Sequence, residues 1–141
     1  MSRSLLEARF VFSRSVGLLL PEVNAIGYDW ILDEAKRSPD QARWNSTHCR
    51  VIVNGKRCEQ LDISHDAPHA FKPIGSRNSV HCQGLAIDLL LFEGGQILND
   101  PAPYRTLGEL WKGYDPELRW GGDFQGFADL GHFSHEWKGR K

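Results

Sequence analysis

Residues 79–92 read Ser-Val-His-Cys-Gln-Gly-Leu-Ala-Ile-Asp-Leu-Leu-Leu-Phe, and the second half of this stretch decides the fold. Leu85–Phe92 is almost continuously apolar, which predicts a buried strand at the centre of a sheet. The next four residues, Glu93–Gln96, contain two adjacent glycines and predict a turn into a short strand at Ile97–Leu98. We therefore expect the sheet to be built around residues 85–92.

Helices and further strands are expected on both sides of this strand. Residues 4–20 predict an amphipathic helix that Pro21 ends or kinks, and residues 103–112 predict a second helix. Residues 28–33, 118–120 and 132–137 predict strands. The apolar or small residues at helical spacing in the first helix are Leu6, Phe10, Ser13, Gly17 and Leu20. Hairpins mixed with helices indicate an α+β domain.

Length and charge exclude several classes of protein. A chain of 141 residues is expected to form a single domain, residues 1–141, and we expect a monomer. The net charge of −1, with both signs interspersed, argues against nucleic-acid binding. No apolar run is long enough for stable membrane insertion. The N-terminal residues 1–14 mix charged and apolar side chains and lack the pattern of a signal peptide, so we expect cytoplasmic synthesis.

Two separated segments carry the residues that can do chemistry. His81 and Asp88 lie in the opening stretch, and residues 129–133, Asp-Leu-Gly-His-Phe, add Asp129 and His132. Two imidazoles and one carboxylate form a three-ligand set that leaves zinc one open position. Asp129 would then be free to shuttle protons. The alternative is that the histidines are ordinary polar residues and that the two aspartates only cap turns.

The same segments resemble a known family, the zinc D-Ala-D-Ala and L-alanyl-D-glutamate peptidases that cut peptidoglycan stem peptides. The pattern S-x-H-x-x-G-x-A-x-D is present from Ser79 to Asp88, and D/E-x-x-H is present at Asp129 and His132. Residues 34–42, Glu-Ala-Lys-Arg-Ser-Pro-Asp-Gln-Ala, are similar to the family's E-A-Y-R-T-P-E-Q-A, with Lys36 in place of the aromatic. The likeness extends from about residue 12 to residue 137. Residues 104–111 and 119–124 are similar to those of small phage and prophage endopeptidases.

The resemblance implies a fold, a cofactor and roles for named residues. The fold is a small antiparallel sheet with helices on one face and one zinc ion on the other, as in the hedgehog/DD-peptidase proteins. The zinc ligands are His81, Asp88 and His132, and the general base is Asp129. Arg37 would stabilise the oxyanion, with Arg57 as the alternative donor. Ser79 would hydrogen-bond the substrate or a metal ligand.

The expected activity is hydrolysis of a peptidoglycan stem-peptide bond, most specifically the L-alanyl-D-glutamate bond, in phage or prophage lysis. Release through a holin would then bring the enzyme to the cell wall. Two alternatives stay open: a D-Ala-D-Ala carboxypeptidase or dipeptidase with the same metal site, and a metal-bearing module that binds wall peptides without cutting them. The ligands alone do not separate the enzymes.

The part of the chain that least resembles the family is Arg43–Pro73, which we interpret as a subgroup-specific insertion. Within it, Asn54–Gly55 predicts the turn of a hairpin. A second, structural zinc site is a further hypothesis, against free thiols, for four residues of this segment: Cys49, Cys58, His65 and His69. Cys82, beside a predicted ligand, is interpreted as a small core residue on a strand, facing away from His81.

Overall fold

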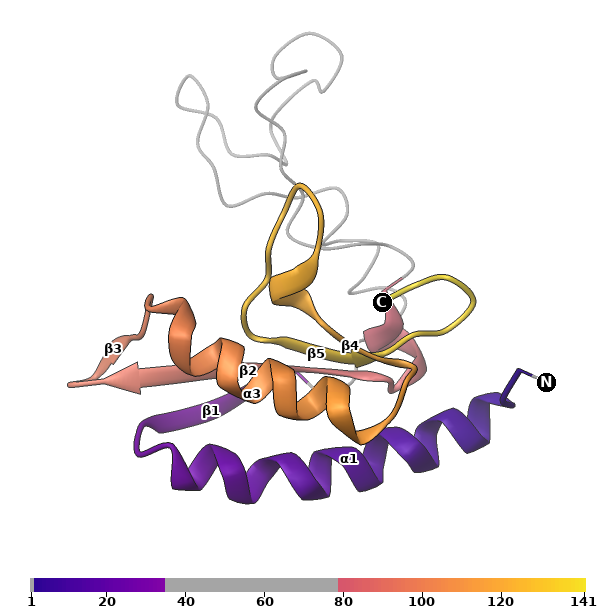
Figure 1. Ribbon diagram of the computed structural model, residues 1–141, viewed down its shortest axis with the longest axis horizontal. Coiled ribbons are helices and arrows are strands. Elements are labelled where there is room, and N and C mark those ends of the chain that lie inside the picture. Colours follow the sequence, from indigo (N-terminus) through magenta and orange to yellow (C-terminus); the bar gives the residue numbers. More distant parts are fainter. Residues whose placement is uncertain (1, 35–78) are drawn as a thin grey trace, which may run out of the picture.

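The computed structural model describes residues 2–34 and 79–141 of the chain (Figure 1). In chain order the elements are α1 (Leu5–Ala25), β1 (Asp29–Glu34), the 3-10 helix η2 (Val80–Gln83), β2 (Ala86–Glu93), β3 (Gln96–Ile97), α3 (Pro101–Tyr114), β4 (Leu118–Trp120), the 3-10 helix η3 (Gly121–Asp123) and β5 (His132–His135). The insertion at residues 43–73 and its hairpin lie outside the described residues.

The strands form one antiparallel sheet in the order β1-β2-β5-β4, and β3 pairs with the end of β2. Strand β2 is central, as its apolar sequence predicts. In Figure 1 α1 lies below the strands, α3 crosses in front of them, and the segment between β4 and β5 rises above the sheet. The predicted α+β fold, with helices on one face of a small antiparallel sheet, is confirmed.

The core fills the space between the sheet and the two helices. Alternate residues of β2 are buried against the helices: Ile87, Leu89 and Leu91. The Trp111 ring of α3 makes edge-to-face contacts with Phe12 of α1 and Phe133 of β5. Because side chains alternate along a strand, Asp88 and His132 face the other side of the sheet, where the resemblance places the zinc.

Helix α1 differs from its prediction in length and in the face that it buries. It begins at a capping box between Ser4 and Glu7 and continues through Pro21 to Ala25. Proline removes the hydrogen bond to the carbonyl four residues earlier, which here belongs to Gly17, and packing of the flanking turns against the sheet keeps the helix intact. The buried residues are Ala8, Phe12, Ser15, Leu19 and Val23. The predicted face was wrong, because Leu6 and Phe10 are 58% and 54% exposed.

The remaining predicted elements are present with small shifts in their ends. Strand β4 covers the predicted residues 118–120, and α3 is longer than predicted by two residues at each end. Helix α3 begins at Asp100, whose carboxylate accepts a hydrogen bond from the Ala102 N–H, and proline occupies its first position. Within residues 2–34 and 79–141 no helix combines the length and apolar character needed to cross a membrane.

Candidate metal centre

Two of the three predicted ligands are fixed by the register of the sheet. Asp88 of β2 lies directly opposite His132 of β5 in the antiparallel ladder. Directly before β5, the Gly131 carbonyl accepts a hydrogen bond from the Leu89 N–H at 2.8 Å. A side chain at position 131 would place its Cβ 2.3 Å from the Leu89 carbonyl oxygen, so this close approach of two backbones requires glycine. The pairing therefore sets the two ligands side by side.

The third ligand, His81, comes from the 3-10 helix η2, which precedes β2. The Ser79 hydroxyl caps this turn by accepting a hydrogen bond from the His81 N–H at 3.2 Å. Gly84 ends the turn in the left-handed conformation, with φ of 69°, which explains the glycine in the motif. The sequence placed this segment on a strand. Because it is a 3-10 turn, Cys82 does not alternate with His81 across a sheet, and it is half-buried rather than in the core.

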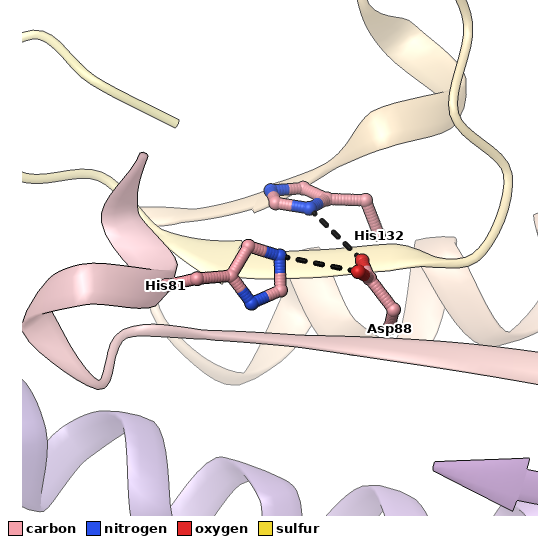
Figure 2. A group of neighbouring side chains, drawn as sticks. All are labelled: His81, Asp88 and His132. Atoms are coloured by element: carbon pink, nitrogen blue, oxygen red, sulfur yellow. Dashed lines mark hydrogen bonds and ion pairs between the residues drawn. The ribbon is translucent and has the colours of Figure 1, made fainter. Parts of the chain in front are cut away.

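The three side chains converge on one point on the helix-free face of the sheet (Figure 2). His81 Nε2 lies 3.3 Å from Asp88 Oδ2, and His132 Nδ1 lies 3.3 Å from Asp88 Oδ1. The residues His81 and His132 are 2% and 6% exposed, and the centroids of their rings are 5.2 Å apart. Two ligands at about 2.0–2.1 Å from a tetrahedral zinc ion lie about 3.3 Å from each other. These separations therefore fit zinc.

The chemistry of the donor set agrees with this geometry. The nitrogens that approach Asp88 are Nε2 of His81 and Nδ1 of His132. Among the described residues, the other nitrogen of each ring is buried and has no hydrogen-bond partner. Two neutral imidazoles and a carboxylate are a donor set that zinc prefers. The residues present thus fit the predicted zinc ion, with an open position for a further ligand.

The electrostatics of the site separate its two carboxylates. Burial alone would raise the pKa of Asp88, but its contacts with His132 and His81 outweigh burial and hold that pKa well below its usual range. Burial raises the pKa of Asp129, and the negative charge of Asp88 raises it further. The site therefore favours the charged form of Asp88, whereas Asp129 holds a proton more readily, as the predicted proton shuttle would.

The segment between β4 and β5 positions Asp129 beside the ligands. The carbonyl of Gly121 accepts hydrogen bonds from the N–H groups of Phe124 and Asp129, at 3.2 and 2.9 Å, and so closes the loop between them. The Phe124 ring lies 5.5 Å from the His132 ring and forms one wall of the site. The sequence analysis gave Phe124 no role. Its contact with His132 depends on the tertiary fold.

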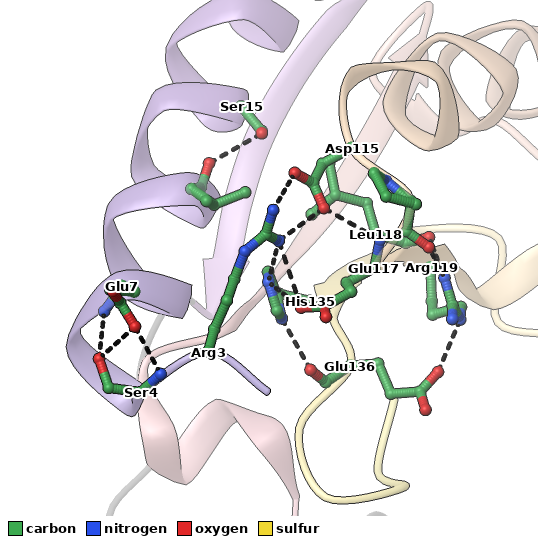
Figure 3. A network of polar contacts seen from close by, with 12 residues as sticks. Arg3, Ser4, Glu7, Ser15, Asp115, Glu117, Leu118, Arg119, His135 and Glu136 are labelled. Carbon is green, nitrogen blue, oxygen red and sulfur yellow. Dashed lines mark hydrogen bonds and ion pairs between the residues drawn. The ribbon is translucent and has the colours of Figure 1, made fainter. Parts of the chain in front are cut away.

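A second group of metal-type side chains lies on the helix side of the sheet and is already engaged by Arg3. It consists of Asp115, Glu117 and His135. The Arg3 guanidinium donates two 2.7 Å hydrogen bonds to the Asp115 carboxylate and a third, at 3.2 Å, to Glu117 (Figure 3). His135 is fully buried and contacts Glu117 and the Glu136 carbonyl. These contacts give His135 a structural role.

Among the other predicted site residues, Ser79 lies in the described part of the chain. Ser79 contacts the backbone of His81, and its contact with substrate stays a prediction. Arg37 and Arg57 lie outside the described residues, as do the four residues of the second zinc hypothesis, Cys49, Cys58, His65 and His69. Their roles stay predictions as well.

A converging His-Asp-His set with an adjacent carboxylate of raised pKa, on an antiparallel sheet backed by helices, defines a zinc metallopeptidase. Comparisons with known proteins support this class. Residues 74–135, which contain all three ligands and Asp129, match the family model described as D-alanyl-D-alanine carboxypeptidase. This match supports the resemblance to the zinc D-Ala-D-Ala and L-alanyl-D-glutamate peptidases that the sequence motifs indicate.

The fold is shared with a solved structure at low sequence identity. The vancomycin resistance D,D-pentapeptidase VanY from a VanB-type resistance cassette, in complex with Zn(II), has a TM-score of 0.56 and 16% identity, over 88% of this chain and 70% of VanY. The Serratia marcescens L-Ala D-Glu endopeptidase ChiX has a TM-score of 0.47 and 16% identity, over 89% of this chain and 88% of ChiX. No curated protein matches the sequence.

Proposed function

We propose that this zinc peptidase hydrolyses the L-alanyl-D-glutamate bond of peptidoglycan stem peptides. The observation that carries the peptidase activity is the convergence of His81, Asp88 and His132 beside Asp129. The choice of peptidoglycan rests on the family, and the choice of bond rests on the likeness of residues 104–111 and 119–124 to small phage endopeptidases.

The residues of the chain divide the work of hydrolysis between them. Zinc, when bound, supplies Lewis acidity at the scissile carbonyl and makes an attacking water more acidic. His81, Asp88 and His132 hold the ion on the face of the sheet that the helices leave open. Asp129 takes the proton of the attacking water and returns it to the leaving amine. The raised pKa of Asp129 supports the second transfer, because a carboxyl that holds its proton more readily can act as the acid.

Arg37 is proposed as the donor to the oxyanion, on the likeness of residues 34–42 to the family. Loss of one such donor typically lowers the rate by about 10²–10³-fold. Arg37→Ala should therefore lower kcat at unchanged zinc content, and Arg37→Lys should restore only part of the rate because an ammonium lacks the guanidinium fork. Arg57→Ala is the control. If Arg57→Ala is inactive while Arg37→Ala is active, the alignment of the arginine motif is wrong and residues 43–73 contribute to the active site.

The main alternative is a D-Ala-D-Ala carboxypeptidase or dipeptidase, which the description of the matching family favours. Digestion of purified muropeptides, followed by mass spectrometry, separates the two. An endopeptidase releases the stem peptide with a new D-glutamate amino terminus, whereas a carboxypeptidase removes only terminal D-alanine. If the muropeptides stay intact after incubation with the zinc-loaded protein, and the protein is retained on cell walls in a binding assay, the chain is a binding module instead.

We further propose that the enzyme acts in phage or prophage lysis, and that it is made in the cytoplasm and reaches the wall through a holin. The support is the likeness to phage endopeptidases. Expression in a bacterial host with and without a co-expressed holin tests this. Lysis should require both proteins, and lysis by the peptidase alone would show that it leaves the cytoplasm by another route.

A further inference from the structure

The turn that carries His81 is held from helix α1 by a side chain outside the sequence motif. Arg9 donates a hydrogen bond from Nε to the main-chain carbonyl of Gln83 at 2.7 Å. Gln83 is the last residue of η2 and lies two residues after His81. The bond joins positions 74 residues apart, and the half-buried position of Arg9 shields it partly from water.

This contact completes the support of the turn. The last carbonyl groups of a helix lack partners within the helix and need donors from outside. The Ser79 hydroxyl holds the first turn of η2, and the Gly84 N–H returns to the His81 carbonyl. Arg9 supplies a charged donor to the carbonyl of Gln83, at the end of the turn. Hydrogen bonds from charged donors are stronger than those from neutral donors. The two ends of η2 are thus fixed by different parts of the chain.

We propose that Arg9 is a positioning residue for the metal site, because it holds η2 where His81 Nε2 faces Asp88. The inference rests on the assignment of His81 as a zinc ligand and is independent of which peptide bond the enzyme cuts. Without Arg9, the turn can shift while Asp88 and His132 stay locked in the β2–β5 ladder. Residues that orient metal ligands typically change metal affinity by about 10–100-fold when they are replaced.

The test compares zinc affinity in full-length variants, by competition with a chromophoric chelator. Arg9→Ala should weaken zinc binding about 10–100-fold. Arg9→Lys should fall between Arg9→Ala and the wild type, because lysine keeps a charged donor but loses the geometry of the guanidinium. Arg14→Ala, an exposed arginine on the same helix, is the matched control and should bind zinc like the wild type. Visible spectra of the cobalt-substituted Arg9→Ala protein should change, since they report ligand geometry.

A purely structural role would give a different result. Arg9→Ala would then melt at a lower temperature without zinc while keeping wild-type zinc affinity and cobalt spectrum, and this outcome overturns the proposal. If Arg9→Ala does not fold, the zinc affinity of Arg9→Lys is compared with that of Arg14→Ala. Equal zinc affinities contradict the proposal, and a lower zinc affinity of Arg9→Lys supports it. His81→Ala tests separately whether His81 is a zinc ligand. Wild-type zinc binding by that variant would show that it is not.

Discussion

The metal site joins two regions that hold their ligands by different means. Asp88 and His132 belong to neighbouring strands, and the antiparallel ladder fixes their separation. His81 belongs to a short 3-10 turn outside the sheet, and local contacts at both ends of that turn fix its position. The core of the fold therefore holds Asp88 and His132 in place, whereas a few polar contacts hold His81. We expect the turn to be the sensitive half.

Removal of a ligand from either region should have the largest effect. His81→Ala and His132→Ala each leave two protein ligands, so stoichiometric zinc should be lost from both proteins. Metal analysis after gel filtration measures this, and circular dichroism checks that the fold is retained. Full zinc occupancy in either variant would show that the corresponding region does not contribute to the site.

Asp129→Ala separates catalysis from metal binding. Because Asp129 is assigned to proton transfer and not to either set of ligands, zinc content should be unchanged. The rate of muropeptide hydrolysis should fall by about 10²–10⁴-fold, the usual contribution of a positioned base. Hydrolysis near the wild-type rate at matched zinc content would remove Asp129 from the mechanism.

Two glycine substitutions test the contrast between sheet and turn directly. Gly131→Ala drives a Cβ into the Leu89 carbonyl, and overpacking of this kind typically destabilises a protein by about 1–3 kcal/mol. Gly84→Ala places alanine in the left-handed region at a cost of about 1–2 kcal/mol, but in a turn rather than in the sheet.

We therefore expect Gly131→Ala to lower the free energy of unfolding of the zinc-free protein more than Gly84→Ala does. Relative to its loss of stability, Gly84→Ala should show the larger loss of zinc affinity. Denaturant unfolding and chelator competition measure the two quantities. The opposite ranking would mean that the turn is part of the cooperative core.

The smallest effect is expected for Arg3, which fastens the N-terminus to the sheet on the face away from the metal. Arg3→Ala should lower the free energy of unfolding by about 1 kcal/mol and leave zinc affinity unchanged. The hydrogen bonds from Arg3 hold the pKa of Asp115 below its usual range. Their contribution is therefore present at neutral pH and is lost as the pH falls through the lowered pKa.

The stability difference between wild type and Arg3→Ala should accordingly shrink below about pH 4, the ordinary range of an aspartate. Denaturant unfolding at pH 7 and at lower pH values measures it. A difference that stays constant with pH would show that the ion pair with Asp115 is not the source of the stabilisation.

Sequence patterns sufficed where the information was local. The apolar run of β2, the glycine turn after it and the motif from Ser79 to Asp88 predicted the central strand, the hairpin and the candidate ligands. The pairing of Asp88 with His132 was predicted only through the resemblance, because the residues are 44 positions apart. Local pattern therefore predicted the ligands, and the sheet register brought them together.

Features that depend on distant contacts were missed or wrong. The stripe through Leu6 and Phe10 indicated a buried face, but the sheet and α3 pack against the face through Phe12 and Leu19. The arginines that fasten α1 to the rest of the fold have partners more than 70 positions away, and a helical pattern carries no signal for such partners. The 3-10 turn at His81 depends on the cap at Ser79 and on Gly84. The alternation of apolar and polar residues along a strand does not detect such a turn.

The position of the zinc ion can be measured by anomalous diffraction at the zinc edge, from crystals of the zinc-loaded protein. We expect one strong zinc peak bounded by His81, Asp88 and His132, on the face of the sheet opposite α1 and α3. A zinc peak at Asp115, Glu117 and His135 instead, or no peak at the predicted position, would contradict this expectation.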